Sequence, residues 1–290
     1  MTSLQAQERR FALGPGIIAA TSFAFSDALA KLVFADGGDV LTLALIRGVV
    51  GLGMLFVYIR LGPPLKADTA RTRAIALGLG ALFAAVVYGL FQAIALITVP
   101  IAVLTYFIYP LLTGIGGWVF GVERLSWQGA LAALVAFFGL ALMIGGYPQH
   151  LSALGIAFAL GAALSRAVFL LVARAELQQA DPRLTTWNSL VSSTAIFAIA
   201  TLATMNWHAP QNAVGWISVF VVSVATASGI LMLYVSTNRI GPFRTALIMN
   251  LEPLLATLLS APLLGEIITP LQAVGGAVML GALVAFQLRR

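Results

Sequence analysis

Five ionisable side chains lie within long apolar stretches of this 290-residue sequence: Asp27, Lys31, Arg47, Arg166 and Glu252. A charged side chain at the centre of a membrane-spanning helix costs about 2.5–3.5 kcal/mol on insertion scales, so such residues normally line a cavity or pair with one another. Three of the five are basic and two are acidic, which leaves one formal positive charge in excess. This set predicts a polar interior suited to a small zwitterion rather than to a strongly anionic molecule.

The spacing of these residues allows more than one role for each. Asp27 and Lys31 are four residues apart and share a helix face, where they form either a structural ion pair or part of a gate or proton relay. Arg47 lies near enough to the end of its stretch to extend its charge toward the membrane surface, and gating is its other candidate role. Arg166 can pair with Asp27 or Glu252, or it can hold a substrate carboxylate.

Glu252 precedes Pro253, and proline has no N–H to donate to the carbonyl one turn back. We therefore predict a helix break at Pro253, beside Asn250 and the carboxylate, and a corresponding break at Pro110. Burial disfavours the charged form of a carboxylate, so Glu252 is a candidate for proton coupling. Anchoring of the loosened helix is the alternative role.

Aromatic and amide side chains also follow helical spacing. Tyr88 and Gln92 are four residues apart and Tyr106 and Tyr109 are three apart, so each pair presents polar groups on one helix face. A phenol deep in a membrane prefers a hydrogen-bond partner. The predicted substrate-binding residues are Tyr88, Gln92, Tyr106, Tyr109, Arg166, Trp187, Asn188 and Asn250. Core packing with a satisfied hydroxyl is the alternative for the tyrosines.

The composition indicates which elements must position these residues. Apolar residues make up 60% of the chain and charged residues only 9%, whereas a soluble domain carries about 25% charged residues. Most of the surface must therefore face lipid. The net charge of +6 would suit nucleic acid only if Lys and Arg clustered among aromatic residues, and here they are scattered. The absence of cysteine excludes disulfides and thiol catalysis.

A helix needs about 20 apolar residues to span a bilayer. Ten such stretches alternate with short linkers: 14–34, 39–60, 74–97, 99–121, 127–146, 152–174, 184–205, 212–238, 242–264 and 269–288. The polar residues 1–13 are expected to form a cytoplasmic tail with no cleaved signal peptide. With that orientation, thirteen of the sixteen Lys and Arg residues fall in or beside cytoplasmic segments and none falls in an outside loop. We predict an all-α integral membrane protein with both termini in the cytoplasm.

The two halves of the chain, 14–146 and 147–290, resemble each other. Ser26-Asp27-Ala28 aligns with Ser165-Arg166-Ala167, and Tyr109-Pro110 with Glu123 aligns with Glu252-Pro253 and Glu266. Because each half holds five helices, the second half must be inserted upside down relative to the first. We therefore predict two inverted five-helix repeats around a central cavity, an arrangement that suits alternating access to one midplane site.

The segments from Pro110 to Glu123 and from Pro253 to Glu266 resemble the drug/metabolite transporter superfamily, and more narrowly its EamA-type repeats. Leu264-Gly265-Glu266 is close to the Gly-Glu ending of such repeats, and Arg47 falls where they often carry a basic residue. The chain is most similar to the YddG-type exporters of aromatic and other neutral amino acids. This resemblance implies a multi-pass secondary transporter of the bacterial inner membrane that exports amino acids and related small metabolites by alternating access.

Other functions stay open from the residues alone. Export or exchange of drugs, nucleotide sugars or other metabolites would use the same architecture, and so would a channel. A membrane-embedded enzyme is disfavoured, because His150 and His208 lie singly in loops and no metalloprotease, esterase or P-loop motif occurs. We expect no catalytic residue, metal or cofactor. The expected partners are a small-molecule substrate and membrane lipid, without nucleic acid, and the chain is expected to act as a monomer.

Overall fold

The computed structural model describes residues 3–66, 68–144, 152–205, 207–264 and 267–288, and these ranges contain helices and no strand. The helices are α1 (Ser3–Ala35), α2 (Val40–Leu61), α3 (Ala70–Leu96), α4 (Val99–Tyr106), α5 (Tyr109–Val119), α6 (Trp127–Ile144), α7 (Ala153–Glu176), α8 (Pro182–Thr204), α9 (Ala213–Ile240), α10 (Pro242–Ile248), α11 (Leu251–Leu264) and α12 (Pro270–Leu288). Within the described ranges, nine segments are long and apolar enough to cross a membrane, and Pro270–Phe286 is a shorter apolar helix. The chain is therefore a multi-pass membrane protein.

The helices coincide with the apolar stretches of the sequence, with two kinds of difference. Helix α1 begins at Ser3, so residues 3–13 continue the first helix where a separate tail was expected. The predicted spans 99–121 and 242–264 are each divided into two shorter helices, α4 with α5 and α10 with α11. The predicted boundary between the halves at 146–147 lies outside the described residues, as does Glu266 of the predicted repeat.

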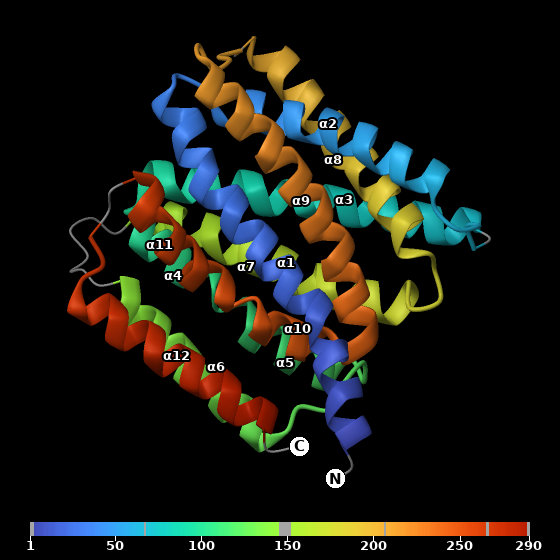
Figure 1. Cartoon of the computed structure of the whole chain (residues 1–290), viewed down its shortest axis with the longest axis vertical. Coiled ribbons are helices and arrows are strands. Elements are labelled where there is room, and N and C mark those ends of the chain that lie inside the picture. The colour runs from blue at the N-terminus through green and yellow to red at the C-terminus, as the bar shows by residue number, and fades with distance from the viewer. Residues whose placement is uncertain (1–2, 67, 145–151, 206, 265–266, 289–290) are drawn as a thin grey trace.

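The packing of the helices shows an internal two-fold relationship. Helix α1 packs along α9, and α7 packs along α3, which is the same pairing with the two halves exchanged. Helices α2 and α8 pack against each other, as do α6 and α12, and in each pair the two members occupy equivalent places in the two halves. Figure 1 shows α1 beside α9 in the middle of the molecule and the α6–α12 pair along one side. A duplicated five-span unit accounts for this pattern.

The α6–α12 pair depends on two glycines that let the helix backbones meet. A Cβ atom added at Gly275 would lie 2.4 Å from the backbone nitrogen of Met143 and 2.5 Å from the carbonyl oxygen of Gly139. A Cβ atom added at Gly139 would lie 2.7 Å from the backbone nitrogen of Met279. Small residues at such crossings are typical of helix packing in membranes, where close van der Waals contact provides much of the association energy.

We expect Gly275→Leu to destabilise the protein by about 1–3 kcal/mol, because the new side chain meets backbone atoms that cannot rotate away. The measurement is the temperature at which half of the detergent-purified protein loses its monodisperse chromatography peak. Gly281→Leu is the matched control on the same helix, since a Cβ atom there meets nothing within 4 Å. Equal midpoints for the two variants would contradict this account of the α6–α12 contact.

At one end of the bundle, an arginine joins two connecting loops. Arg183 donates hydrogen bonds to the carbonyl oxygens of Pro63 (2.8 Å) and Pro64 (3.2 Å), and it forms an ion pair of 2.7 Å with Asp181. Burial opposes the negative charge of Asp181, but hydrogen bonds from Arg183 and from the backbone of Lys66 outweigh it and hold the pKa of that carboxyl below its ordinary value. These contacts fix the ends of α2 and α8 relative to each other.

Candidate functional site

A cavity of about 500 Å³ lies between the two halves. Its walls come from α1, α3, α4, α6, α11 and α12, and the side chains of Arg47 on α2 and Arg166 on α7 also reach it. Along α1 the lining runs from Phe23 through Asp27 to Lys31, and along α11 it runs from Glu252 to Ser260, in both cases toward the end of the helix. The cavity therefore leads from mid-membrane to the end of the bundle that the charge pattern predicts to face away from the cytoplasm.

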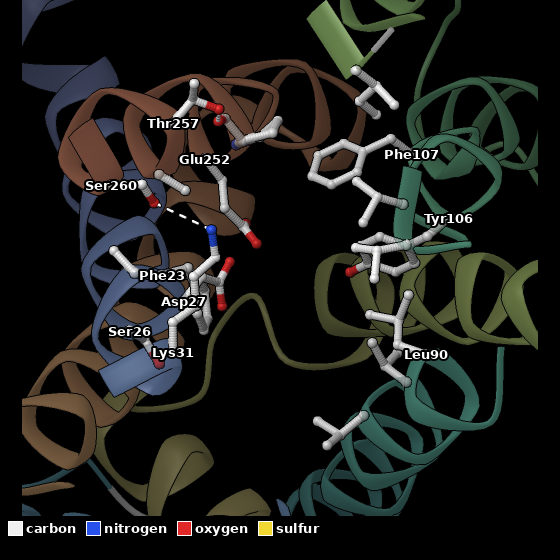
Figure 2. A pocket seen from close by; sticks show the side chains of 18 of the residues that line it. Phe23, Ser26, Asp27, Lys31, Leu90, Tyr106, Phe107, Glu252, Thr257 and Ser260 are labelled. Carbon is white, nitrogen blue, oxygen red and sulfur yellow. Dashed lines mark hydrogen bonds between the residues drawn. The ribbon is translucent and has the colours of Figure 1, made fainter. Parts of the chain in front are cut away.

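Two carboxylates, one from each half, face this cavity. Asp27 lies in the middle of the apolar part of α1, where its neighbours Ala24 and Ala28 are buried. Its own side chain is exposed, because it points into the cavity. Glu252 is in the first turn of α11 and is half-buried. Figure 2 shows both carboxylates directed into the same space from the α1–α11 side. Acidic groups at mid-membrane normally face a water-filled cavity or pair with a cation.

Arg166 lies at the deep end of the cavity, surrounded by aromatic rings. Its guanidinium carbon is 5.3 Å from the ring centroid of Phe23 and 5.9 Å from those of Tyr109 and Phe169. The residue is 3% exposed, and its Nε atom has no hydrogen-bond partner among the described residues. Cation–π contacts contribute up to about 2 kcal/mol for a desolvated guanidinium, but they leave its Nε–H donor available.

Two further cations complete the charged part of the lining. Arg47 is half-buried, interacts electrostatically with Asp27, and has an Nη2 atom without a hydrogen-bond partner in the described part of the chain. Lys31 donates a hydrogen bond of 3.5 Å to the hydroxyl of Ser260, which joins α1 to α11 near the outer end of the cavity. The lining thus contains three cationic and two anionic side chains.

The opposite wall is apolar and aromatic. Figure 2 shows Tyr106, Phe107 and Leu90 across the cavity from Asp27 and Glu252. The rings of Tyr106 and Phe107 meet edge to face with centroids 5.2 Å apart, and Tyr109 packs behind them with its centroid 5.2 Å from that of Tyr106. Valines of α3 and α4 continue this surface. The cavity therefore has one charged wall and one wall suited to an apolar group.

The interruptions of the fourth and ninth spans lie at the level of this site. Helix α4 ends at Tyr106 and α5 begins at Tyr109, so that Pro110 occupies the first turn of α5, where no intrahelical N–H donor is needed. Pro253 similarly lies in the first turn of α11. At this second interruption, Asn250 donates a hydrogen bond of 3.0 Å to the carbonyl oxygen of Leu247. Both prolines thus follow their breaks by two or three residues.

The structure brings some of the residues predicted from sequence to the cavity and places others elsewhere. The cavity is lined by Asp27, Lys31, Arg47, Tyr106, Arg166, Glu252 and Pro253. Tyr109 is buried directly behind Tyr106. Asn250 is also buried and acts within the helix break. Neither residue lines the cavity in this conformation, and their contact with a substrate stays a prediction.

Four predicted substrate-binding residues lie away from the cavity. Tyr88 is 54% exposed on the outer side of α3 and meets Phe158 edge to face at 6.3 Å. The ring of Trp187 packs against Phe56, with a centroid distance of 6.3 Å. Gln92 and Asn188 are half-buried and do not line the cavity. The spacing of residues along a helix shows which side chains share a face of that helix. It does not show whether that face lines the cavity.

The structure also adds lining residues that the sequence did not reveal, among them Phe23, Ser26, Phe107, Thr257 and Ser260. Phenylalanine and serine are common in membrane helices, so their types alone carry no signal. The only usable sequence signal was position: Phe23 precedes Asp27 by four residues on the same helix face. Among the described residues there is no group of three or more side chains that could hold a metal ion.

The other end of the cavity is closed by contacts between α10 of the second half and the helices of the first half. The backbone N–H of Phe243, at the start of α10, donates a hydrogen bond of 3.0 Å to Oε2 of Glu123. The ring of Phe243 packs into the space left by Gly114 and Gly129, where an added Cβ atom would lie 2.8 and 2.7 Å from it. Access to the site from the end nearer Glu123 is therefore blocked in this conformation.

Comparison with known proteins adds a family and a fold. The sequence profile of the EamA-like transporter family matches the chain twice, at residues 11–145 and 153–286. Among solved structures, 29 chains are similar. One of them, described only as the crystal structure of a protein, has 17% sequence identity and a TM-score of 0.79 over 95% of this chain and 97% of that chain. At that identity the likeness shows the fold alone. No curated protein matches the sequence.

Proposed function

The chain belongs to the EamA-like transporter family, and from this we propose that it exports amino acids, aromatic and other neutral ones, together with related small metabolites. In this proposal the protein lies in the bacterial inner membrane and works by alternating access, acting as a monomer. Membership in a family of small-solute transporters sets the class of activity. The nature of the solute is inferred from the site, and the direction of transport from the resemblance of the sequence to exporters.

The observation that carries this proposal is the chemical asymmetry of the cavity. Its charged wall holds both carboxylates and cations, while Leu90, Tyr106 and Phe107 form the opposite wall. An aromatic or aliphatic amino acid carries one ammonium group, one carboxylate and one apolar side chain, which complement the carboxylates, the cations and the apolar wall of the cavity. The volume of about 500 Å³ lies within the range of roughly 300–1,000 Å³ typical of sites for small molecules.

Alternating access requires that the site be open to one side at a time. In this structure the cavity leads to the end of the bundle where α1 and α11 end, and the hydrogen bond from Phe243 to Glu123 helps to close the other end. Because that bond joins the two halves, it must break when the inner end opens. The two interrupted helices, which meet the site at mid-depth, are the elements that would move.

We expect Glu123→Ala to shift the protein toward the state in which its inner end is open. Hydrogen bonds to charged groups contribute about 1.5–3 kcal/mol, so the ratio of closed to open protein should fall roughly 10-fold or more. Since the natural chain has no cysteine, Thr113→Cys places a single thiol on the buried face of α5. The rate at which an impermeant maleimide labels this thiol reports the opening.

The control for this experiment is Glu176→Ala, which removes a carboxylate that pairs with Arg71 at the surface. Labelling of the thiol on α5 should become faster in the Glu123 variant and stay unchanged in the Glu176 variant. Equal labelling rates in the parent and in the Glu123 variant would show that this bond does not hold the inner end closed.

The function itself is tested by uptake of labelled L-phenylalanine into liposomes that contain the purified protein. We expect saturable uptake that L-amino acids inhibit more strongly than D-amino acids, and no uptake into protein-free liposomes. Uptake that rises linearly with concentration would indicate a channel, and inhibition by a nucleotide sugar or a dye but not by amino acids would indicate another substrate class. Conversion of a substrate without flux would indicate an enzyme. Each of these three outcomes would overturn the proposal.

A further inference from the structure

The lining of the cavity is ordered, because its charged side chains and its aromatic and aliphatic side chains lie on different walls. The two carboxylates lie on the α1–α11 side, the aromatic and aliphatic side chains lie across from them on α3 and α4, and Arg166 lies at the deep end (Figure 2 shows the first two). An ordered arrangement of this kind can fix the orientation of a substrate. Assigning each part of the substrate to a group of residues rests on the proposed function and deepens it.

The carboxylates form a site for a cation. Asp27 comes from the first half and Glu252 from the second, and each interacts electrostatically with the other. Lys31, Arg47 and Arg166 offset part of the negative charge at Asp27, and the ammonium group of a ligand that reaches both carboxylates would offset it further. A primary ammonium group offers three N–H donors, which is enough to bond both carboxylates at once. The exposure of Asp27 to the cavity leaves it accessible to such a ligand.

Arg166 forms a complementary site for an anion. The rings of Phe23, Tyr109 and Phe169 hold its guanidinium in place and leave its Nε–H donor unused. An unpartnered N–H group in a buried position is costly, and a carboxylate is the ligand that matches a planar guanidinium. Arg166 also interacts electrostatically with Glu252, so the anion site lies beside the cation site, as the two charged groups of an α-amino acid do.

We propose that the ammonium group of the substrate binds between Asp27 and Glu252, that its carboxylate binds Arg166, and that its side chain lies against Leu90, Tyr106 and Phe107. The substrate class is then an α-amino acid with a free amino group and a large apolar side chain. A zwitterion supplies an ammonium group to the two carboxylates and a carboxylate to the guanidinium, so both charged sites have a ligand of opposite charge. Acylated amino acids and simple carboxylic acids have no ammonium group and can bind only the guanidinium.

The test uses compounds that each lack one charged group. Competition against labelled L-phenylalanine uptake is measured for 3-phenylpropanoate, which lacks the ammonium, for phenethylamine, which lacks the carboxylate, and for N-acetyl-L-phenylalanine. Loss of a hydrogen-bonded charge typically weakens binding by about 10-fold or more, and we expect each compound to compete at least that much more weakly than unlabelled L-phenylalanine. N-acetyl-L-phenylalanine or 3-phenylpropanoate competing as well as L-phenylalanine would overturn the assignment.

Two substitutions then assign the sites. Glu252→Gln should weaken competition by L-phenylalanine and phenethylamine but leave 3-phenylpropanoate unchanged. Arg166→Gln should weaken L-phenylalanine and 3-phenylpropanoate but leave phenethylamine unchanged. If either variant weakens all three compounds by the same factor, its residue supports the fold rather than the substrate, and the assignment is wrong.

The same compounds are tested for stabilisation of the purified protein against heat, which requires no transport. Suppose that Glu252→Gln weakens stabilisation by phenethylamine alone and Arg166→Gln weakens stabilisation by 3-phenylpropanoate alone, but no flux of L-phenylalanine is found. That result would overturn the proposed export function and leave the assigned orientation of the ligand intact. Saturable flux of L-phenylalanine without these opposite effects of the two variants would overturn the assigned orientation and leave the export function intact. The two proposals therefore fail separately.

Discussion

Replacing Asp27 with asparagine is expected to lower L-phenylalanine flux in proteoliposomes by about 10-fold or more, while the protein still inserts and purifies normally. Asparagine has the shape of aspartate but no charge, so the change removes the electrostatic partner of Arg47 and one of the two carboxylates that face the cavity. Hydrogen bonds to charged groups contribute about 1.5–3 kcal/mol, and each 1.4 kcal/mol changes an equilibrium constant tenfold.

The matched control for this substitution is Asp68→Asn. Asp68 lies before α3 and pairs with Arg73 at 3.3 Å, away from the cavity. Pairs of this kind at the surface contribute about 0–1 kcal/mol, so flux should change little. Initial rates are compared at a substrate concentration far below saturation, after the amount of inserted protein has been equalised. Parental flux in the Asp27 variant would remove this residue from the site.

Replacing Arg166 with alanine is expected to have a comparable or larger effect on flux. The change removes the guanidinium at the deep end of the cavity, which interacts electrostatically with Glu252. It also removes the group that Phe23, Tyr109 and Phe169 surround, so we expect a lower unfolding temperature as well. Breaking a buried charge interaction by removing one partner typically costs about 3–5 kcal/mol.

Two further variants separate transport from stability at this position. Arg166→Lys keeps the positive charge but not the planar set of N–H donors. Its unfolding temperature should therefore stay close to that of the parent while its flux falls. Arg71→Ala removes an arginine whose side chain is 78% exposed and pairs with Glu176 at the surface, so it should change neither quantity. Flux in Arg166→Ala that matches the parent at a temperature where both are folded would contradict the assigned role.

The sequence was sufficient to predict where the membrane-spanning segments lie, because their length is dictated by the thickness of the bilayer and their composition by contact with lipid. It also indicated the interruptions near Pro110 and Pro253. The breaks themselves lie earlier, at Phe107–Ile108 and Met249–Asn250, because a proline is accommodated in the first turn of the following helix. Ser3 to Leu13 could not be predicted as helix from hydropathy, since this part of α1 is polar.

The charged part of the site was easier to predict than the rest. Charge within an apolar stretch is costly enough that Asp27, Arg166 and Glu252 could be expected to face a polar interior. Tyrosine carries no such penalty at a membrane interface, so spacing could not distinguish Tyr106, which lines the cavity, from Tyr88, which faces outward. Phe107 could not be singled out among seventeen phenylalanines, because its role depends on how α4 ends.

One site, exposed to one side at a time, is proposed to carry amino acids across the membrane. The most direct test measures the initial uptake of labelled L-phenylalanine into proteoliposomes that contain either buffer or a high concentration of unlabelled L-phenylalanine. We expect the internal substrate to accelerate uptake, because a loaded carrier returns its site faster than an empty one. The Asp27→Asn protein should show strongly reduced uptake and no acceleration. Uptake that internal L-phenylalanine leaves unchanged, or that does not saturate, would contradict alternating access by this chain.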